Sequence, residues 1–84
     1  MKTYQAKIYV SIIESVLDPQ GKTVLKLLQS NCFSSVKDLR VGKFFQLQIE
    51  SESYKNASIL VHSICTEYLV NPIVEEYSFI LEEV

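Results

Sequence analysis

The sequence holds few side chains that could carry out nucleophilic or acid–base chemistry. His62 is the only histidine, and Cys32 and Cys65 are the only cysteines. A cysteine nucleophile needs a nearby base, and such a thiol usually lies at a helix N-terminus or beside a cation. Cys65 follows His62 by three residues within one predicted helix, and Cys32 lies beyond the end of another. The pattern favours a structural histidine and free thiols in a reducing compartment.

The carboxylates and glycines do not form a metal or phosphate motif. Glu75-Glu76 and Glu82-Glu83 are the densest acidic pairs, but neighbouring residues of a strand point to opposite faces, so neither pair converges on one ion. Gly21 and Gly42 are isolated, which excludes a glycine-rich phosphate loop. We therefore expect no catalytic residue, no metal ligand and no cofactor-binding residue in this chain.

Length and charge define a small acidic domain. The 84 residues form one domain, residues 1–84, and a domain of this size benefits from a partner that extends its core. The net charge is −2 and the eight Lys and Arg residues are scattered, so the chain lacks the basic patch of a nucleic-acid-binding protein. No apolar run approaches the ~20 residues that span a bilayer. Since the first residues also lack the pattern of a signal peptide, we expect a cytoplasmic location with no membrane contact.

The spacing of apolar residues predicts four strands and two helices. Apolar side chains alternate with polar ones in the predicted strands, and they recur every three to four residues in the predicted helices. The predicted strands are 4–13, 36–41, 44–50 and 74–82, and the predicted helices are 19–30 and 54–70. Between the second and third strands, Gly42-Lys43 suits a two-residue hairpin turn.

The order of these elements predicts an α+β fold. A β-α-β-β-α-β chain is typical of the ferredoxin-like split arrangement, a four-stranded antiparallel sheet with two helices on one face. The other sheet face would carry Tyr9, Phe44 and Ile80 among polar residues. The first interpretation is that they have no function, because scattered exposed apolar residues are normal on protein surfaces. They also resemble a platform for stacking RNA bases, but the basic residues of such platforms are missing. The third interpretation is dimerisation through the sheets with a second copy.

The stretch 16–21 marks the start of the first helix. Asp18 is a good N-cap, and Pro19 suits the first helical position. Neither Gln20 nor Gly21 is needed for the cap, and glycine in a first helical turn costs up to about 1 kcal/mol relative to alanine. We expect either close packing of the helix on the sheet or close approach of a partner to explain Gly21.

Four segments together resemble one known family. They occur between Tyr4 and Glu83, in the order AKIYVSII, VLDPQGKTV, VKDLRVGKFFQLQIE and YLVNPIVEEYSFILEE. They look like the PurS family, the small subunit of phosphoribosylformylglycinamidine synthase. The resemblance implies an ATP-dependent, glutamine-hydrolysing step of purine biosynthesis that makes formylglycinamidine ribonucleotide. It implies two partners, a glutaminase and a synthetase that holds ATP and Mg²⁺, and a homo-oligomeric adaptor, dimer or tetramer, that assists ammonia transfer between them.

The same resemblance points to residues at three loops. Four of the matching residues already have a structural explanation. Capping explains Asp18 and the first helical position explains Pro19, while a turn explains Gly42 and helix termination explains Pro72. The candidates for contact with a partner subunit are Arg40, Lys43, Gln20, Gly21 and Glu75. An alternative function is a small-molecule-sensing regulatory module of ferredoxin-like fold, with a ligand pocket at a dimer interface near the start of the first helix.

Overall fold

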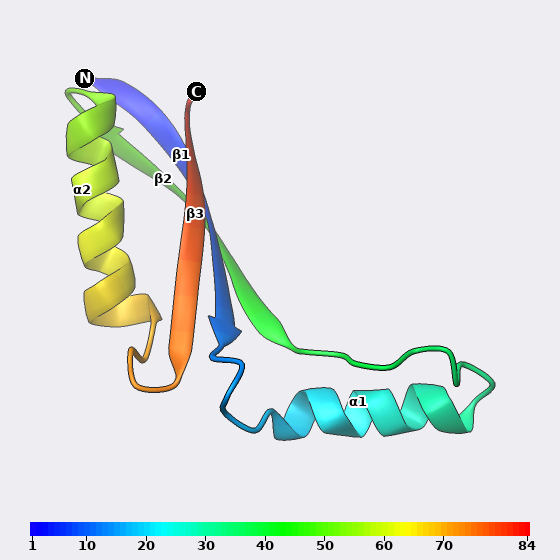
Figure 1. Cartoon of the computed structure of the whole chain (residues 1–84). Coiled ribbons are helices and arrows are strands. Elements are labelled where there is room, and N and C mark those ends of the chain that lie inside the picture. The colour runs from blue at the N-terminus through cyan, green and yellow to red at the C-terminus, as the bar shows by residue number, and fades with distance from the viewer.

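The chain forms a three-stranded sheet with one helix packed on it and a second helix that projects away (Figure 1). The computed structural model describes all residues 1–84. The elements are β1 (Lys2–Ile12), α1 (Pro19–Ser30), β2 (Gly42–Ser51), α2 (Tyr54–Ile64), a π-helical turn η1 (Cys65–Leu69) and β3 (Glu75–Glu83). We call the sheet with α2 and η1 the body, and residues 17–41, which contain α1, the arm.

The core lies between the sheet and α2. β1 is the central strand and pairs antiparallel with β2 and with β3. Its alternate residues Tyr4, Ala6, Ile8 and Val10 are each at most 2% exposed, because both neighbouring strands and α2 surround them. From α2 and η1, the buried side chains are Ala57, Val61 and Cys65. The period-two pattern of 4–13 therefore predicted the buried face of β1 correctly.

The predicted four-stranded sheet is wrong. Residues 36–41 form no strand and pair with no strand of the chain, so the sheet has only the order β2-β1-β3. The predicted hairpin at Gly42-Lys43 is absent as well. Both residues belong to β2, where Gly42 pairs with Ser11 and Lys43 with Val10. The imperfect alternation of 36–41 predicted a strand that does not form, because alternation carries no information about which edge a segment pairs with.

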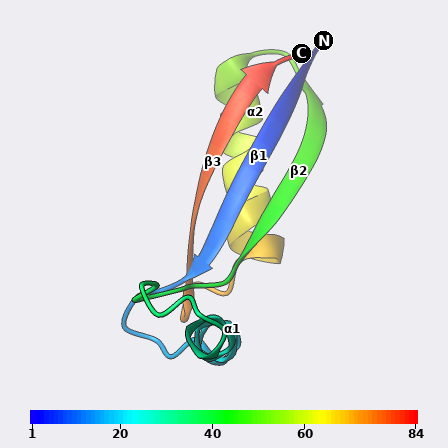
Figure 2. The same ribbon diagram turned by 90° about the vertical axis from the view of Figure 1, so that its right-hand side faces the viewer.

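The predicted placement of both helices on one sheet face is also wrong. Only α2 packs on the sheet, whereas α1 extends away from the strands (Figure 1). Figure 2 looks onto the sheet face opposite α2 and shows α1 end on, so the arm projects on that side. The radius of gyration is 16.6 Å, whereas a compact domain of this length has about 12 Å. The boundaries of α1 were predicted correctly, because capping and periodicity are local properties, but its packing was not.

The arm consists of two antiparallel layers, α1 and the return segment 31–41. Cys32 adopts a positive φ of 73° just beyond the helix, and the N–H of Phe33 donates to the carbonyl of Leu28. Near the tip, the side-chain amide of Gln29 donates to the carbonyl of Val36 over 2.9 Å. The return segment therefore runs back along α1 and leads directly into β2.

The tight approach of β1 explains Gly42 and provides a test of this strand pairing. A Cβ atom at Gly42 would lie 2.5 Å from the carbonyl oxygen of Val10, which is closer than atoms can pack. Gly42→Ala should therefore lower the free energy of unfolding by about 1–3 kcal/mol, measured by urea denaturation. Ser11→Ala, on the exposed residue paired with Gly42, is the matched control and should change little. An unchanged urea midpoint for Gly42→Ala would contradict the strand pairing.

Candidate functional site

The loops that join the arm to the body form a polar junction, and all five predicted partner-contact residues contribute to its hydrogen bonds, ion pair or cavity. The cavity there has a volume of about 110 Å³. Its lining comes from β1, the start of α1, the start of β2 and the start of β3: Val10, Ile12, Asp18, Gln20, Val41, Gly42, Lys43 and Glu75. Gly21 is buried beside Asp18, and Arg40 borders a neighbouring hollow. We call Asp18, Gln20, Gly21, Arg40, Lys43 and Glu75 the junction.

The carboxylate of Asp18 connects the start of α1 to the start of β2. One oxygen accepts the N–H of Gly21 over 3.0 Å, which is the predicted N-cap, and the other accepts the N–H of Val41 over 2.8 Å. Asp18 is 4% exposed. The hydrogen bond from Val41, followed by that from Gly21, lowers the pKa of this carboxyl below its ordinary value. A residue predicted only as a local cap therefore also fixes a contact 23 residues away along the chain.

Close packing accounts for Gly21. A Cβ atom there would lie 2.7 Å from the carbonyl oxygen of Leu39 and would also clash with the Asp18 carboxylate. The return segment thus crosses directly over the first turn of α1. Gly21 is thus explained by packing against the return segment within the chain, and the expected packing of this helix on the sheet is wrong.

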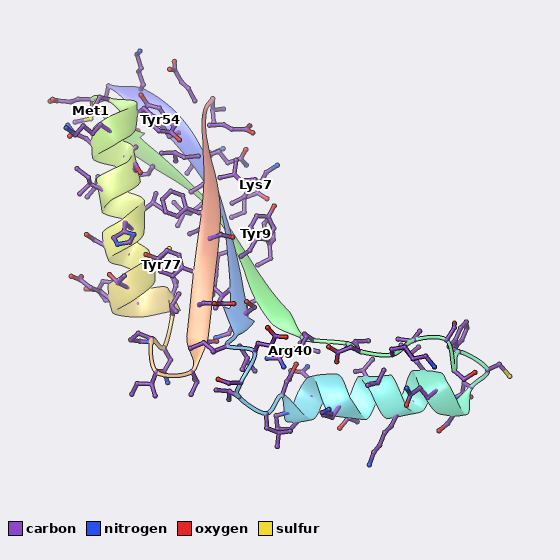
Figure 3. All side chains as sticks on the ribbon, in the orientation of Figure 1. Met1, Lys7, Tyr9, Arg40, Tyr54 and Tyr77 are labelled. Carbon is purple, nitrogen blue, oxygen red and sulfur yellow. The ribbon has the colours of Figure 1, made fainter.

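Arg40 binds the backbone of its own chain. One terminal nitrogen of its guanidinium donates to the carbonyls of Ile12 and Ile13 over 2.9 and 3.1 Å. Longer contacts of 3.5 Å reach the carbonyls of Glu14 and Val16. These carbonyls lie where the chain leaves β1, and Figure 3 shows Arg40 at the corner between the sheet and α1. The arginine satisfies carbonyls of an irregular turn, a role that sequence spacing could not indicate across about 26 residues.

Lys43 and Glu75 form an ion pair at the other wall of the cavity. The ammonium of Lys43 lies 3.2 Å from one Glu75 oxygen, and the N–H of Asn71 donates to the other over 2.8 Å. The hydrogen bond from Asn71 is the main cause that lowers the pKa of Glu75, and Lys43 adds to it. Gln20 lines the same cavity and is exposed. Lys43 is more than half exposed, so the pair presents a cation at the surface of the junction.

Tyr9, Phe44 and Ile80 gather on the sheet face opposite α2, which we call the open face. Tyr9 and Phe44 are directly paired across β1 and β2, and their ring centroids are 5.2 Å apart. Ile80 lies on β3 diagonally across from Tyr9. The three side chains are 43%, 53% and 51% exposed. Figure 3 shows Tyr9 and Lys7 pointing away from α2, whereas Tyr77 points toward it.

The remaining reactive side chains are separate from the junction. His62 on α2 hydrogen-bonds through Nδ1 with the hydroxyl of Tyr77 on β3. Burial raises the pKa of the Cys65 thiol and, together with that thiol, the pKa of Tyr77. Cys32 lies exposed at the tip of the arm. No group of three His, Cys, Asp or Glu side chains is placed to hold a metal ion. No helix is long and apolar enough to cross a membrane.

The fold and junction define a three-stranded α+β module with a projecting helical arm. The family model for PurS, phosphoribosylformylglycinamidine (FGAM) synthase, matches residues 5–83. Phosphoribosylformylglycinamidine synthase subunit PurS of Bacillus subtilis is 43% identical over 81 residues, covering 96% of this chain and 95% of that one. Its counterpart in Thermotoga maritima is 39% identical over 77 residues, covering 92% and 94%.

Solved structures agree with this match. A C2 crystal form of B. subtilis PurS superposes with a TM-score of 0.87 at 42% identity, covering 95% of this chain and 99% of that chain. The structure of PurLQS from T. maritima contains a chain with a TM-score of 0.88 at 37% identity, covering all of both chains. The chain belongs to the PurS family, and it is a subunit of the ligase FGAM synthase of purine biosynthesis. The family resemblance of the sequence is thereby confirmed.

The depressed pKa of Asp18 leads to a prediction about acid stability. A carboxyl whose pKa is lower in the folded state contributes stability above its unfolded pKa of about 3.9, and this is lost as the pH falls through the folded pKa. Asp18→Asn should lower the urea midpoint near neutral pH, because an amide NH₂ cannot accept the N–H of Val41. It should also flatten the fall of that midpoint between about pH 5 and pH 2.

Glu67→Gln, on an exposed carboxylate of η1, is the control for this experiment. It should retain the wild-type dependence of the urea midpoint on pH. If the urea midpoints of Asp18→Asn and wild type fell in parallel on acidification, titration of Asp18 would not be the cause of the acid-induced loss of stability.

Proposed function

We propose that this chain is the non-catalytic adaptor of its FGAM synthase, bridging a glutaminase subunit and an ATP-dependent synthetase subunit. The observation that supports this role most directly is the junction, where elements from both halves of the chain present Lys43 and Gln20 around one small cavity. The junction contains no cysteine or histidine. The glutamine-hydrolysing cysteine, ATP and Mg²⁺ then belong to the partner subunits, and the adaptor helps ammonia pass between them in the cytoplasm.

The predicted contact residues at the junction have two different roles. Arg40, Gly21 and Asp18 hold the arm at its angle through contacts within the chain. Lys43 carries a single ion pair and is solvent-accessible, so its ammonium is available to a carboxylate of a partner subunit. Gln20 and Glu75 flank it around the cavity. We therefore assign the partner contact to Lys43 first and to Gln20 and Glu75 beside it.

Reconstitution with the cognate glutaminase and synthetase tests the adaptor role. The chain should stimulate FGAM formation when glutamine supplies the nitrogen, with much less effect when free ammonia replaces glutamine. Lys43→Ala should raise the concentration needed for half-maximal stimulation roughly 30-fold or more, because losing a desolvated charge contact costs about 2–5 kcal/mol.

Lys55→Ala, at an exposed lysine of α2, is the matched control and should stimulate like wild type. Absence of stimulation by the wild-type chain would refute the adaptor role. Wild-type behaviour of Lys43→Ala would refute only the assigned contact.

We further propose that the open face joins two copies of the chain into a homo-oligomer. Tyr9, Phe44 and Ile80 form a cross-strand apolar cluster on a sheet face that no helix covers. Burying them removes apolar surface from water, and each fully buried side chain of this kind contributes about 1.5–3 kcal/mol. This free energy of association is large for a body whose own buried core is so small.

Phe44→Asp tests this interface by light scattering after size exclusion. The oligomer should dissociate into a smaller species, because a buried carboxylate would face the partner's apolar side chains. Tyr68→Asp replaces a more exposed aromatic residue on η1 and should leave the mass unchanged. Equal masses for Phe44→Asp and wild type would contradict an interface at the open face.

The small-molecule-sensing alternative is not favoured. Within one chain, the cavity near the start of α1 has a volume of about 110 Å³, well below the roughly 300–1,000 Å³ of typical ligand sites. A larger hollow of about 390 Å³ lies at the opposite end of the sheet, around Met1 and Ile59. The family match across residues 5–83 accounts for the chain without a sensing role.

A further inference from the structure

The outer surface of α2 carries apolar side chains that the chain itself does not bury. The buried stripe of α2 and η1 consists of Ala57, Val61 and Cys65. Ile59 and Leu60 lie outside that stripe and are exposed. A helix packed on a sheet normally has polar residues at such positions, so packing within the chain does not explain these two residue types.

Ile59 and Leu60 line the largest hollow of the molecule, which we call the distal hollow. It has a volume of about 390 Å³ and lies between the first turns of α2 and the end of β2. Figure 3 shows Met1 and Tyr54, the first residue of α2, at this end of the molecule, and both are exposed. Methionine and aromatic residues are enriched where proteins bind each other. The full lining is Met1, Glu50, Ser51, Glu52, Asn56, Ile59 and Leu60.

The distal hollow stays accessible when the other proposed surfaces are occupied. α2 lies on the face of the sheet opposite the open face (Figure 2), so two open faces can meet without covering it. Ser51, which lines the hollow, pairs with Lys2, whereas Ile12 lines the junction cavity. The length of β1 between Lys2 and Ile12, roughly 33 Å, therefore separates the two sites. Two partners can then bind one chain at the same time.

The charge at the distal hollow is opposite to the charge that the junction presents. Glu50 and Glu52 border the hollow, are exposed and form no ion pair within the chain. Lys2, at the same end of the sheet, pairs with Glu83 instead. The junction presents the ammonium of Lys43. Because complementary charges favour a partner and like charges repel it, the two sites select different subunits.

We propose that the distal hollow is the docking site for the partner subunit that does not bind Lys43, and that it takes an apolar side chain flanked by Arg or Lys. This inference rests on the adaptor role proposed above. The apolar side chain covers Ile59 and Leu60, and the flanking cations pair with Glu50 and Glu52. An apolar anchor in a pocket, surrounded by polar contacts that exclude water, is the usual arrangement of an interface hot spot.

Photo-cross-linking in the reconstituted complex identifies what covers the distal hollow. Ile59→benzoylphenylalanine should link to only one of the two partner subunits, at a segment that places Arg or Lys beside an apolar residue, as checked by mass spectrometry of the linked peptides. Tyr68→benzoylphenylalanine, on an exposed residue of η1 outside the hollow, is the matched control and should not link to that segment. Links to a second copy of this chain, to both partners or to neither would overturn the inference.

Stimulated turnover tests whether the two docking sites serve different subunits. Ile59→Asp should raise the concentration needed for half-maximal stimulation at least tenfold, and an excess of one partner should reverse this loss by mass action. An excess of the other partner should reverse the loss in Lys43→Ala. Ile59 is exposed, so the urea midpoint of Ile59→Asp should equal that of wild type. Rescue of both variants by the same partner would contradict two separate sites.

Reversing the charge at the rim tests the chemistry of the partner and leaves the apolar residues in place. Glu50→Lys/Glu52→Lys should raise the half-maximal concentration several-fold at low salt and much less at high salt, because salt screens exposed charges. Glu67→Lys, at an exposed carboxylate of η1, is the control and should stimulate like wild type. An effect that is absent, or equal at both salt concentrations, would exclude a basic partner segment.

The outcomes for the distal hollow and for the adaptor role are distinguishable. If wild type and Ile59→Asp stimulated turnover equally, the hollow would not be a docking site, and the adaptor role would stand. If the wild-type chain failed to stimulate turnover, the adaptor role itself would be refuted. A lower mass of Ile59→Asp in light scattering would assign the hollow to a second copy of the chain and would also overturn the inference.

Discussion

The carboxylate of Asp18 is the interaction on which the shape of the molecule depends. Its two oxygens bind the N–H of Gly21 in α1 and the N–H of Val41 before β2, so one side chain sets where the helix begins and where the return segment rejoins the sheet. Arg40 secures the other side of the same corner through the carbonyls that follow β1. Because Gly21 lets the return segment pass within contact of α1, the arm leaves the body in one direction.

Because the arm projects, the chain exposes a large surface relative to the size of its buried core. Thirteen of 84 residues are buried, and all but a few of them lie between the sheet and α2. A domain of this size is marginally stable even when compact, and the arm contributes little to the shared core. The exposed aromatic pair of the open face and the partly buried Phe45 and Leu47 leave apolar surface that the chain itself does not cover.

The shape of the chain fits the proposed adaptor role. Family membership places the chain within FGAM synthase, and its own residues offer contact groups around the junction rather than an assembled nucleophile and base. A rigid corner is useful for bridging, because the angle between arm and body determines how far apart bound partners lie. Mutations that loosen Asp18 or Arg40 would therefore affect assembly through geometry, even where they touch no partner.

The sequence by itself determined the elements and the family. Alternation predicted β1 and its buried face, capping at Asp18 and Pro19 predicted the start of α1, and four ordered segments indicated the PurS family. The tertiary structure decided that α1 leaves the sheet, that residues 36–41 pair with no strand of their own chain, and that Arg40 serves the backbone. The reason is that periodicity and capping are local, so they specify a strand or helix and the face it buries. Which neighbour covers that face depends on contacts distant in sequence, such as the one from Asp18 to Val41, and these leave no periodic signal.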